Sequence, residues 1–128
     1  MSEYNNQRMV LIVEDQAPMR AVLRDFITLS CPGWRCLEAE DGAGARRLFT
    51  QPYPEIVLMD ISLPDANGID LTRRFKELAP ESAFVVMSVQ AGPQITERAL
   101  AAGAAIFIPK DRIFTELKPF IARINAGS

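Results

Sequence analysis

The run Ile56-Val57-Leu58-Met59, which ends at Asp60, constrains the fold of this chain more than any other stretch. Four consecutive apolar residues have the length and composition of a strand that is buried on both faces of a parallel sheet. Pro64 and the pair Asn67-Gly68 follow, and they predict a turn before the next helix. Open α/β sheets bind their ligands at the carboxyl ends of their strands, so Asp60 is a candidate functional residue.

The same pattern recurs along the chain, where apolar runs alternate with amphipathic segments. Strands are expected at 9–13, 34–39, 56–59, 83–87 and 104–108. Apolar residues three and four positions apart predict the helical faces Met19, Val22, Leu23, Phe26 and Ile27; Ala45, Leu48 and Phe49; Leu71, Phe75 and Leu78; Ile95, Ala99 and Ala102; and Ile113, Leu117, Phe120, Ile121 and Ile124.

Five strands that alternate with five helices through short turns specify one α/β domain, in which helices cover both faces of a parallel sheet. We therefore predict a five-stranded parallel, doubly wound (βα)5 domain over residues 9–126. The polar residues 1–8 are predicted to form a flexible N-terminal tail.

Composition excludes several classes of function. The chain has 128 residues, a net charge of −2 and no histidine. A net negative charge argues against nucleic-acid binding, and the missing histidine excludes Ser-His-Asp and Cys-His catalysis. There is no signal peptide and no apolar run of the ~20 residues that a membrane span needs. We therefore expect a cytoplasmic protein in which Cys31 and Cys36 are reduced.

Polar side chains follow four of the predicted strands: Glu14 and Asp15, Asp60, Ser88, and Lys110. Strand ends of a parallel sheet share one edge, so these groups should converge. Three carboxylates would raise one another's pKa values unless a cation neutralised them. Lys110 and one hard divalent cation, such as Mg²⁺, would balance the charge. Such a site suits phosphoryl transfer, in which the protein supplies charge and alignment.

Each residue then takes a role in this chemistry. Asp60 is the expected nucleophile, which would form an aspartyl phosphate. Asp15 would ligate Mg²⁺ directly and Glu14 through water. The Ser88 hydroxyl and the Lys110 ammonium would contact phosphoryl oxygens. Taken singly, Ser88 could instead be a turn hydroxyl and Lys110 a solvated surface lysine.

With these residues in place, the chain resembles a response-regulator receiver domain of bacterial two-component signalling, over about residues 9–125. The resemblance is carried by Glu14-Asp15, the run 60–64 with Gly68, Ser88, and the ending 107–110. It implies a flavodoxin-like fold. The pair Lys110-Asp111 resembles the subfamily whose regulators carry a helix-turn-helix output domain, which would imply transcription regulation.

The family implies that a sensor histidine kinase or phosphotransfer protein donates a phosphoryl group to Asp60. It implies that Asp15, Asp60 and the backbone carbonyl of Ser62 coordinate Mg²⁺ or Mn²⁺. Slow self-catalysed hydrolysis would follow, so the chain would be a signalling phosphoacceptor rather than an enzyme. Ser88 would move inward and Phe107 would swing after it, which would change the partner surface formed by the fourth helix, fifth strand and fifth helix.

Three residues depart from the common family pattern. Val89 stands where a small residue is usual, and it could narrow access to the phosphorylation pocket. Gln90 could orient or block an attacking water. Phe107 replaces the commoner tyrosine, so a switch here would lack that hydroxyl.

Two other functions stay open at this point. One is a receiver fold that binds partners without phosphorylation. The other is an aspartate-nucleophile phosphatase of the haloacid-dehalogenase kind, which needs a second acid two positions after the nucleophile, where this chain has Ser62. We expect no membrane contact and no direct nucleic-acid binding. A phosphorylation-dependent homodimer through the last helix is an alternative to core packing of its apolar residues.

Overall fold

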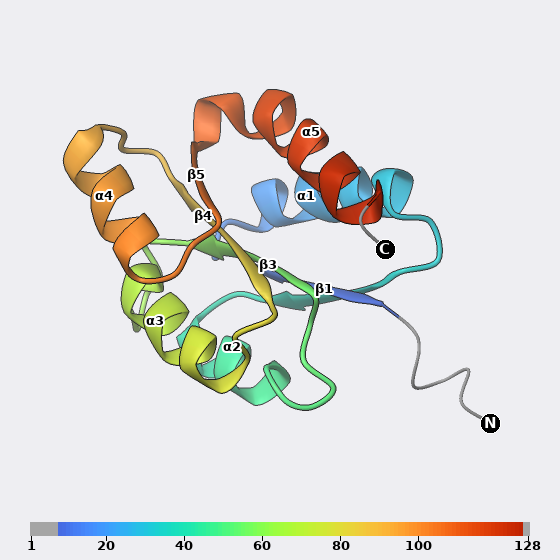
Figure 1. Cartoon of the computed structure of the whole chain (residues 1–128), viewed down its shortest axis with the longest axis horizontal. Coiled ribbons are helices and arrows are strands. Elements are labelled where there is room, and N and C mark those ends of the chain that lie inside the picture. The colour runs from blue at the N-terminus through green and yellow to red at the C-terminus, as the bar shows by residue number, and fades with distance from the viewer. Residues whose placement is uncertain (1–7, 127–128) are drawn as a thin grey trace.

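The computed structural model describes residues 8–126 of the chain. The elements in chain order are β1 Met9–Val13, α1 Ala17–Ser30, β2 Arg35–Ala39, α2 Gly42–Leu48, β3 Ile56–Asp60, α3 Gly68–Leu78, β4 Ala83–Ser88, α4 Pro93–Ala101, β5 Ile106–Pro109, the 3₁₀ helix η2 Lys110–Arg112, and α5 Ile113–Ala126. The strands form one parallel sheet in the order β2-β1-β3-β4-β5 (Figure 1). This confirms the predicted doubly wound (βα)5 architecture.

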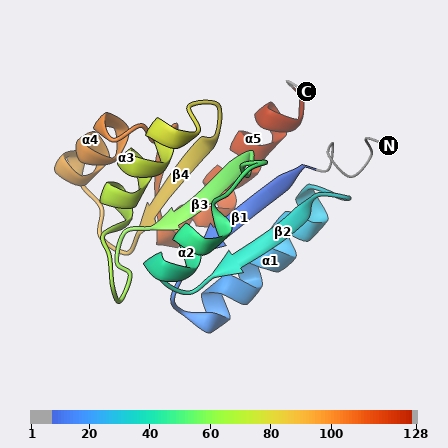
Figure 2. The same ribbon diagram turned by 90° about the horizontal axis from the view of Figure 1, so that it is seen from below.

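Helices cover both faces of the sheet (Figures 1 and 2). Successive strand residues point to opposite faces, so each strand feeds two cores. Leu58 packs in the core beneath α1 and α5, and its neighbour Met59 packs in the core beneath α2 and α3. A third, smaller cluster packs α4 against the sheet. The central strands are buried throughout, as their uninterrupted apolar sequences predict.

Two predicted strands begin later than expected, because their first residues belong to the preceding turn. Trp34 donates its backbone N–H to the carbonyl of Cys31 at 3.1 Å and lies outside β2. Ala104 donates its N–H to Ala99 at 3.1 Å, which continues the end of α4, so β5 starts at Ile106.

Two predicted core residues are wrong. Val22 is 49% exposed and Leu78 is 56% exposed. Val22 lies at the edge of the apolar stripe of α1, which contacts the core through Leu23 and Ile27. Leu78 is the last residue of α3 and lies beyond the part of that helix that is buried against the sheet. Periodicity alone does not show where a helix outruns the sheet.

The amino-terminal boundary lies close to the predicted one. Arg8, which the sequence places in the tail, hydrogen-bonds with Glu55 and lies 4.1 Å from the centroid of the Trp34 ring. Residues 1–7 lie outside the described residues, so the flexible tail stays a prediction. Cys31 and Cys36 are free thiols, as expected. Within residues 8–126, no helix is long and apolar enough to cross a membrane.

The start of α3 is pressed against the end of β3. Asn67 caps the helix, because its side-chain oxygen accepts the N–H groups of Ile69 at 2.8 Å and Asp70 at 3.3 Å. Gly68 donates its N–H to the Ile61 carbonyl at 2.8 Å. A Cβ at Gly68 would collide with the backbone carbonyl of Asp60. The absence of a side chain at position 68 therefore lets α3 begin directly beside Asp60.

We expect Gly68→Ala to destabilise the protein by about 2–3 kcal/mol, since the added methyl group must displace backbone. Without that contact, replacing glycine by alanine in a helix would stabilise the protein by up to ~1 kcal/mol. The sign of the change in unfolding free energy therefore shows whether the contact exists. Urea unfolding measures it.

Gly33→Ala is the matched control. A Cβ there meets nothing within 4 Å, although the backbone φ is +86°. It should cost about 1–2 kcal/mol and leave the amide NMR signals of Asp60 and Ile61 unmoved. A Gly68→Ala variant as stable as wild type would contradict the contact.

Candidate functional site

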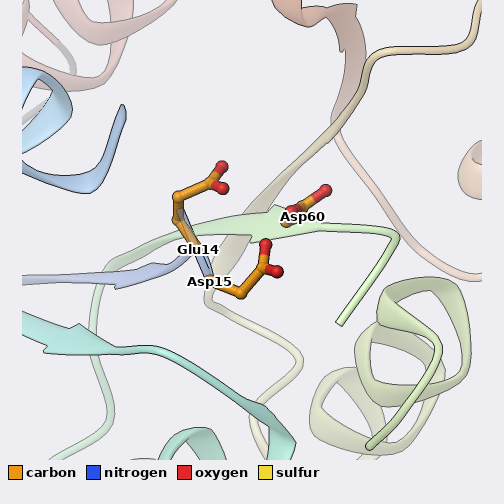
Figure 3. A group of neighbouring side chains, drawn as sticks. All are labelled: Glu14, Asp15 and Asp60. Carbon is orange, nitrogen blue, oxygen red and sulfur yellow. The ribbon is translucent and has the colours of Figure 1, made fainter. Parts of the chain in front are cut away.

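The site forms at the carboxyl ends of the strands, where the order of the sheet reverses. β1 is followed by Glu14 and Asp15, and Asp60 is the last residue of β3. β1 and β3 are neighbours, but the chain leaves β1 toward β2 on one side and continues from β3 toward β4 on the other. A crevice opens at such a switch point. Figure 3 shows the three acidic side chains gathered there.

The three carboxylates lie close enough to share one cation. One oxygen from each of Glu14, Asp15 and Asp60 lies within 4.8 Å of the others. Glu14 is fully buried, Asp60 is 2% exposed, and Asp15 is partly exposed. The sequence predicted this convergence, and the structure confirms that these three acids meet.

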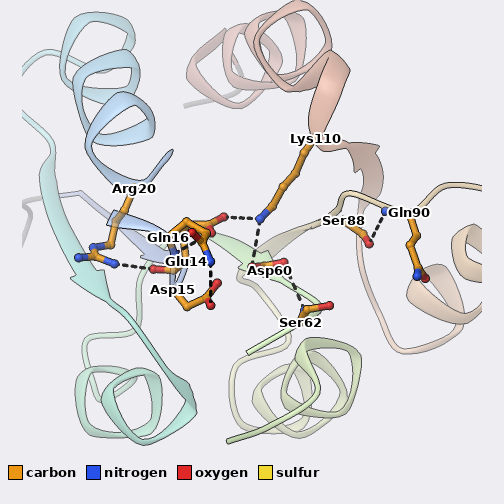
Figure 4. Close-up of polar contacts among 9 residues, drawn as sticks. All are labelled: Glu14, Asp15, Gln16, Arg20, Asp60, Ser62, Ser88, Gln90 and Lys110. Atoms are coloured by element: carbon orange, nitrogen blue, oxygen red, sulfur yellow. Dashed lines mark hydrogen bonds and ion pairs between the residues drawn. The ribbon is translucent and has the colours of Figure 1, made fainter. Parts of the chain in front are cut away.

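Lys110 joins the two buried acids. Its Nζ lies 2.8 Å from Oε1 of Glu14 and 3.1 Å from Oδ2 of Asp60. The lysine comes from η2, directly after β5, and its long side chain reaches past β4 to the acids (Figure 4). Its side chain is only 13% exposed, so Lys110 is not a solvated surface lysine.

Burial and charge shift the pKa values of this group. Burial, and next the nearby Glu14 carboxylate, raise the pKa of Asp60 to about 6, although Lys110 and the Ser62 N–H act to lower it. Burial tends to lower the pKa of Lys110, but its hydrogen bonds to Glu14 and Asp60 outweigh that effect, and the pKa rises. The site therefore holds excess negative charge that one ammonium does not balance.

Both carboxylate oxygens and the backbone carbonyl of Glu14 have polar contacts. Its Oε2 accepts the backbone N–H of Gln16 at 3.1 Å, while its Oε1 faces Lys110. Its backbone carbonyl accepts a hydrogen bond from Nη1 of Arg20 at 2.7 Å (Figure 4). Among residues 8–126, Asp15 makes one long hydrogen bond, 3.4 Å, with the side chain of Gln16. Asp15 is thus less constrained than Glu14, and the water-mediated role of Glu14 stays a prediction.

The donor set fits a hard divalent cation. All three acids supply carboxylate oxygens, and the N–H of Ser62 donates to Oδ1 of Asp60 at 3.3 Å. The Ser62 carbonyl stays a predicted further ligand. The bridge between Ser62 and Asn67 uses the N–H groups of Gly68 and Leu63, so it does not engage the Ser62 carbonyl. Oxygen ligands of this kind suit Mg²⁺ or Mn²⁺.

Ser88 ends β4, and Phe107 lies in the neighbouring strand β5. Ser88 is 4% exposed, and its Oγ accepts the backbone N–H of Gln90 at 3.0 Å, so the hydroxyl is directed toward Gln90 (Figure 4). The Phe107 ring is already buried, at 8% exposure, in a cluster with Ala99 of α4 and Ala102 at the end of that helix. The inward swing implied by the resemblance would therefore not start from an exposed ring.

Val89 and Gln90 both lie exposed on the loop after β4, and Val89 is 79% exposed. Their roles in access stay predictions. The apolar residues Ile113, Leu117, Phe120 and Ile121 of α5 are buried in the core beneath α1 and α5, which supports core packing over a dimer face for them.

Sequence reasoning missed two residues near the site. Arg20 orients the Glu14 carbonyl, and Asp65 accepts the N–H groups of Gly42 at 2.7 Å and Ala43 at 3.0 Å. No local sequence signal marks Asp65, because its partners in α2 lie 22 and 23 positions away.

We expect Asp60→Asn to stabilise the metal-free protein by about 1–3 kcal/mol at pH 7. The folded pKa of about 6 lies above the ordinary 3.8, so folded wild type loses stability as the pH rises from 4 to 6. Asparagine does not ionise, so the variant does not lose this stability as the pH rises. The stability difference between Asp60→Asn and wild type should therefore vanish near pH 4. Urea unfolding in the presence of a chelator measures it.

Asp25→Asn removes the same charge from a side chain that is 70% exposed and should change stability by less than about 0.5 kcal/mol. A wild-type stability that is unchanged between pH 4 and 7 would contradict the raised pKa of Asp60.

Comparison with known proteins identifies the family. The family model described as "Response regulator receiver domain" matches residues 10–122. The chemotaxis protein CheY of Thermotoga maritima is 37% identical over 102 residues, which cover 79% of this chain and 83% of CheY. A protein-glutamate methylesterase/protein-glutamine glutaminase of Pyrococcus abyssi is 36% identical over 102 residues, 79% of this chain but only 28% of that protein.

A solved structure shares the fold as well. The chain superimposes on a two-component response regulator of the LuxR family from Aurantimonas sp. SI85-9A1 with a TM-score of 0.82 and 29% identity, covering 95% of this chain and 87% of that one. The five-stranded parallel sheet agrees with these matches. The chain belongs to the response-regulator receiver domain family.

Proposed function

We propose that the chain is the phosphoaccepting module of a two-component phosphorelay, in which Asp60 receives a phosphoryl group from a phosphohistidine of a sensor histidine kinase or phosphotransfer protein. The observation that carries the proposal is the buried carboxylate of Asp60, held between Lys110 and the acid pair Glu14 and Asp15. The 128-residue sequence contains no histidine, which is consistent with a phosphohistidine donor that acts in trans.

In the transfer step, a carboxylate oxygen of Asp60 attacks phosphorus while the P–N bond to the donor histidine breaks, and the bond's electron pair leaves with the imidazole. Mg²⁺ or Mn²⁺, held by Asp15, Asp60 and the Ser62 carbonyl, would supply positive charge beside the phosphoryl oxygens. Lys110 would exchange its contact with Oδ2 of Asp60 for a phosphoryl oxygen.

The Ser88 hydroxyl would take part in the same step. Its Oγ accepts the N–H of Gln90, but the hydroxyl hydrogen can still be donated, because a hydroxyl donates and accepts at once. A phosphoryl oxygen at Asp60 is the partner that we assign to it. Movement of Ser88 toward that oxygen would disturb the packing of β4 and β5 around Phe107.

The output surface would be α4, β5 and α5, whose contacts with a partner change when the new anion biases the site. The relatives differ in their output: the methylesterase is much longer than this chain, and the LuxR-family neighbour is named as a two-component response regulator. A helix-turn-helix output domain, with transcription regulation, is the form that Lys110-Asp111 favours. A phosphorylation-dependent homodimer is compatible with the same surface.

The alternatives have less support. A phosphorylation-independent module would not need Asp15 and Lys110 gathered around a buried Asp60. A phosphatase would need a second acid at position 62, where Ser62 supplies no carboxylate.

We expect wild type to gain one phosphoryl group from acetyl phosphate and Mg²⁺, and Asp60→Asn to gain none, because the nucleophile is gone. Intact-mass spectrometry reads the result. Asp25→Asn, which removes an exposed carboxylate, should be phosphorylated like wild type. Equal phosphorylation of Asp60→Asn would overturn the site assignment.

We also expect Val89→Ala to accelerate phosphorylation by small donors, because a smaller side chain beside the pocket widens access. The rate constant with acetyl phosphate at saturating Mg²⁺ measures this. Leu100→Ala trims another exposed side chain, on α4, and should leave the rate unchanged. An unchanged rate in Val89→Ala would mean that Val89 does not limit access.

A further inference from the structure

The loop between β3 and α3 is a short hairpin with Asp65 at its tip. Ser62 and Asn67 face each other across an antiparallel bridge, closed by hydrogen bonds from Gly68 to Ile61 at 2.8 Å and from Leu63 to Ala66 at 3.3 Å. The base of the hairpin starts at Asp60, and Ser62 lies on its first arm. A change in the position of the hairpin tip would therefore change the position of the Ser62 carbonyl.

Asp65 ties this tip to α2. Its Oδ1 accepts the N–H of Gly42 at 2.7 Å, and its Oδ2 accepts the N–H of Ala43 at 3.0 Å. These two bonds lower the pKa of Asp65, so the carboxylate is charged at neutral pH. Both side-chain oxygens are thus used by a helix that lies 22 to 23 positions away in sequence.

The first turn of α2 is built to receive this carboxylate. Asp41 caps the same turn by accepting the N–H of Gly44 at 2.7 Å, which leaves the N–H groups of Gly42 and Ala43 for Asp65. A Cβ at Gly42 would lie 2.8 Å from Cβ of Ala66 and 3.0 Å from Oδ1 of Asp65, so glycine permits the hairpin to pack there. Both sides of the contact are therefore adapted to each other.

We propose that Asp65 is a positioning residue for the divalent cation of the proposed phosphorylation site: it clamps the hairpin tip to α2 and so holds the Ser62 carbonyl beside Asp15 and Asp60. This inference rests on the proposed function. Asp65 touches neither the cation nor the phosphoryl group. It acts through the backbone of its own hairpin.

The clamp and the cation must then stabilise each other. If the closed clamp increases cation affinity by some factor, cation binding increases the ratio of closed to open clamp by the same factor. The N–H groups of Gly42 and Ala43 report this ratio, because they are released to water when the clamp opens. If Asp65 served only to cap α2, cation binding would not change how often its hydrogen bonds to Gly42 and Ala43 open.

The first arm of the test is a Mg²⁺ titration followed by the NMR signals of the backbone amides of Asp60 and Ser62. We expect Asp65→Ala to bind Mg²⁺ about tenfold more weakly than wild type, as when other outer partners of metal ligands are removed. Asp65→Asn, which keeps one acceptor oxygen, should lie between the two. Far-ultraviolet circular dichroism checks that both variants are folded.

Asp70→Asn is the matched control for charge. Asp70 lies in the first turn of α3, is exposed, and pairs with Arg73 instead of α2. It should bind Mg²⁺ like wild type. If Asp70→Asn and Asp65→Asn lost the same Mg²⁺ affinity, the loss would come from removing a negative charge, and the positioning role of Asp65 would be overturned. Unchanged affinity in both Asp65 variants would overturn the proposal outright.

The second arm is amide hydrogen exchange of Gly42 and Ala43 in wild type, with and without saturating Mg²⁺. We expect protection to rise with Mg²⁺ by about the factor by which Asp65→Ala weakens binding. If Mg²⁺ did not change the protection of the Gly42 and Ala43 amides, the clamp would be overturned and the phosphorylation proposal would stand. If wild type binds no Mg²⁺ at all, the proposed function fails, and the clamp fails with it.

Discussion

The contact of Lys110 with two buried carboxylates is the interaction on which the rest of the site depends. Burying an isolated carboxylate is costly, and burying Glu14 and Asp60 side by side is costlier, because each repels the other. The Lys110 ammonium offsets this cost, because its Nζ lies 2.8 Å from Oε1 of Glu14 and 3.1 Å from Oδ2 of Asp60. One ammonium cannot balance three acids, so the edge of the sheet keeps an affinity for further positive charge.

The fold delivers these groups because parallel strands end at one edge. The acids come from β1 and β3, the hydroxyl from β4 and the lysine from the turn after β5. The loop after β3 adds a second level of control. Gly68 brings α3 against the backbone of Asp60, and Asp65 ties the same loop to α2. The loop that follows Asp60 is thus fixed to two helices, α3 at its base and α2 at its tip.

Much of this was predictable from the sequence, and the failures have physical causes. Uninterrupted apolar runs located the central strands, and the acids and lysine that end them located the site. The packed position of Phe107 was not predictable, because it depends on the small side chains Ala99 and Ala102 of another helix. Asp65 looked like an ordinary turn residue, since its partners are more than twenty positions away. Val22 and Leu78 satisfied the helical period, but the period does not reveal where the sheet ends.

We propose that Asp60 is the residue that carries the phosphoryl group. The most direct test is to treat wild type with acetyl phosphate and Mg²⁺, reduce it with borohydride, and map the peptides by mass spectrometry. Borohydride converts a phosphorylated aspartate to homoserine and leaves free carboxylates unchanged. We predict homoserine at position 60 alone. Conversion at another acid, with position 60 still aspartate, would contradict the account.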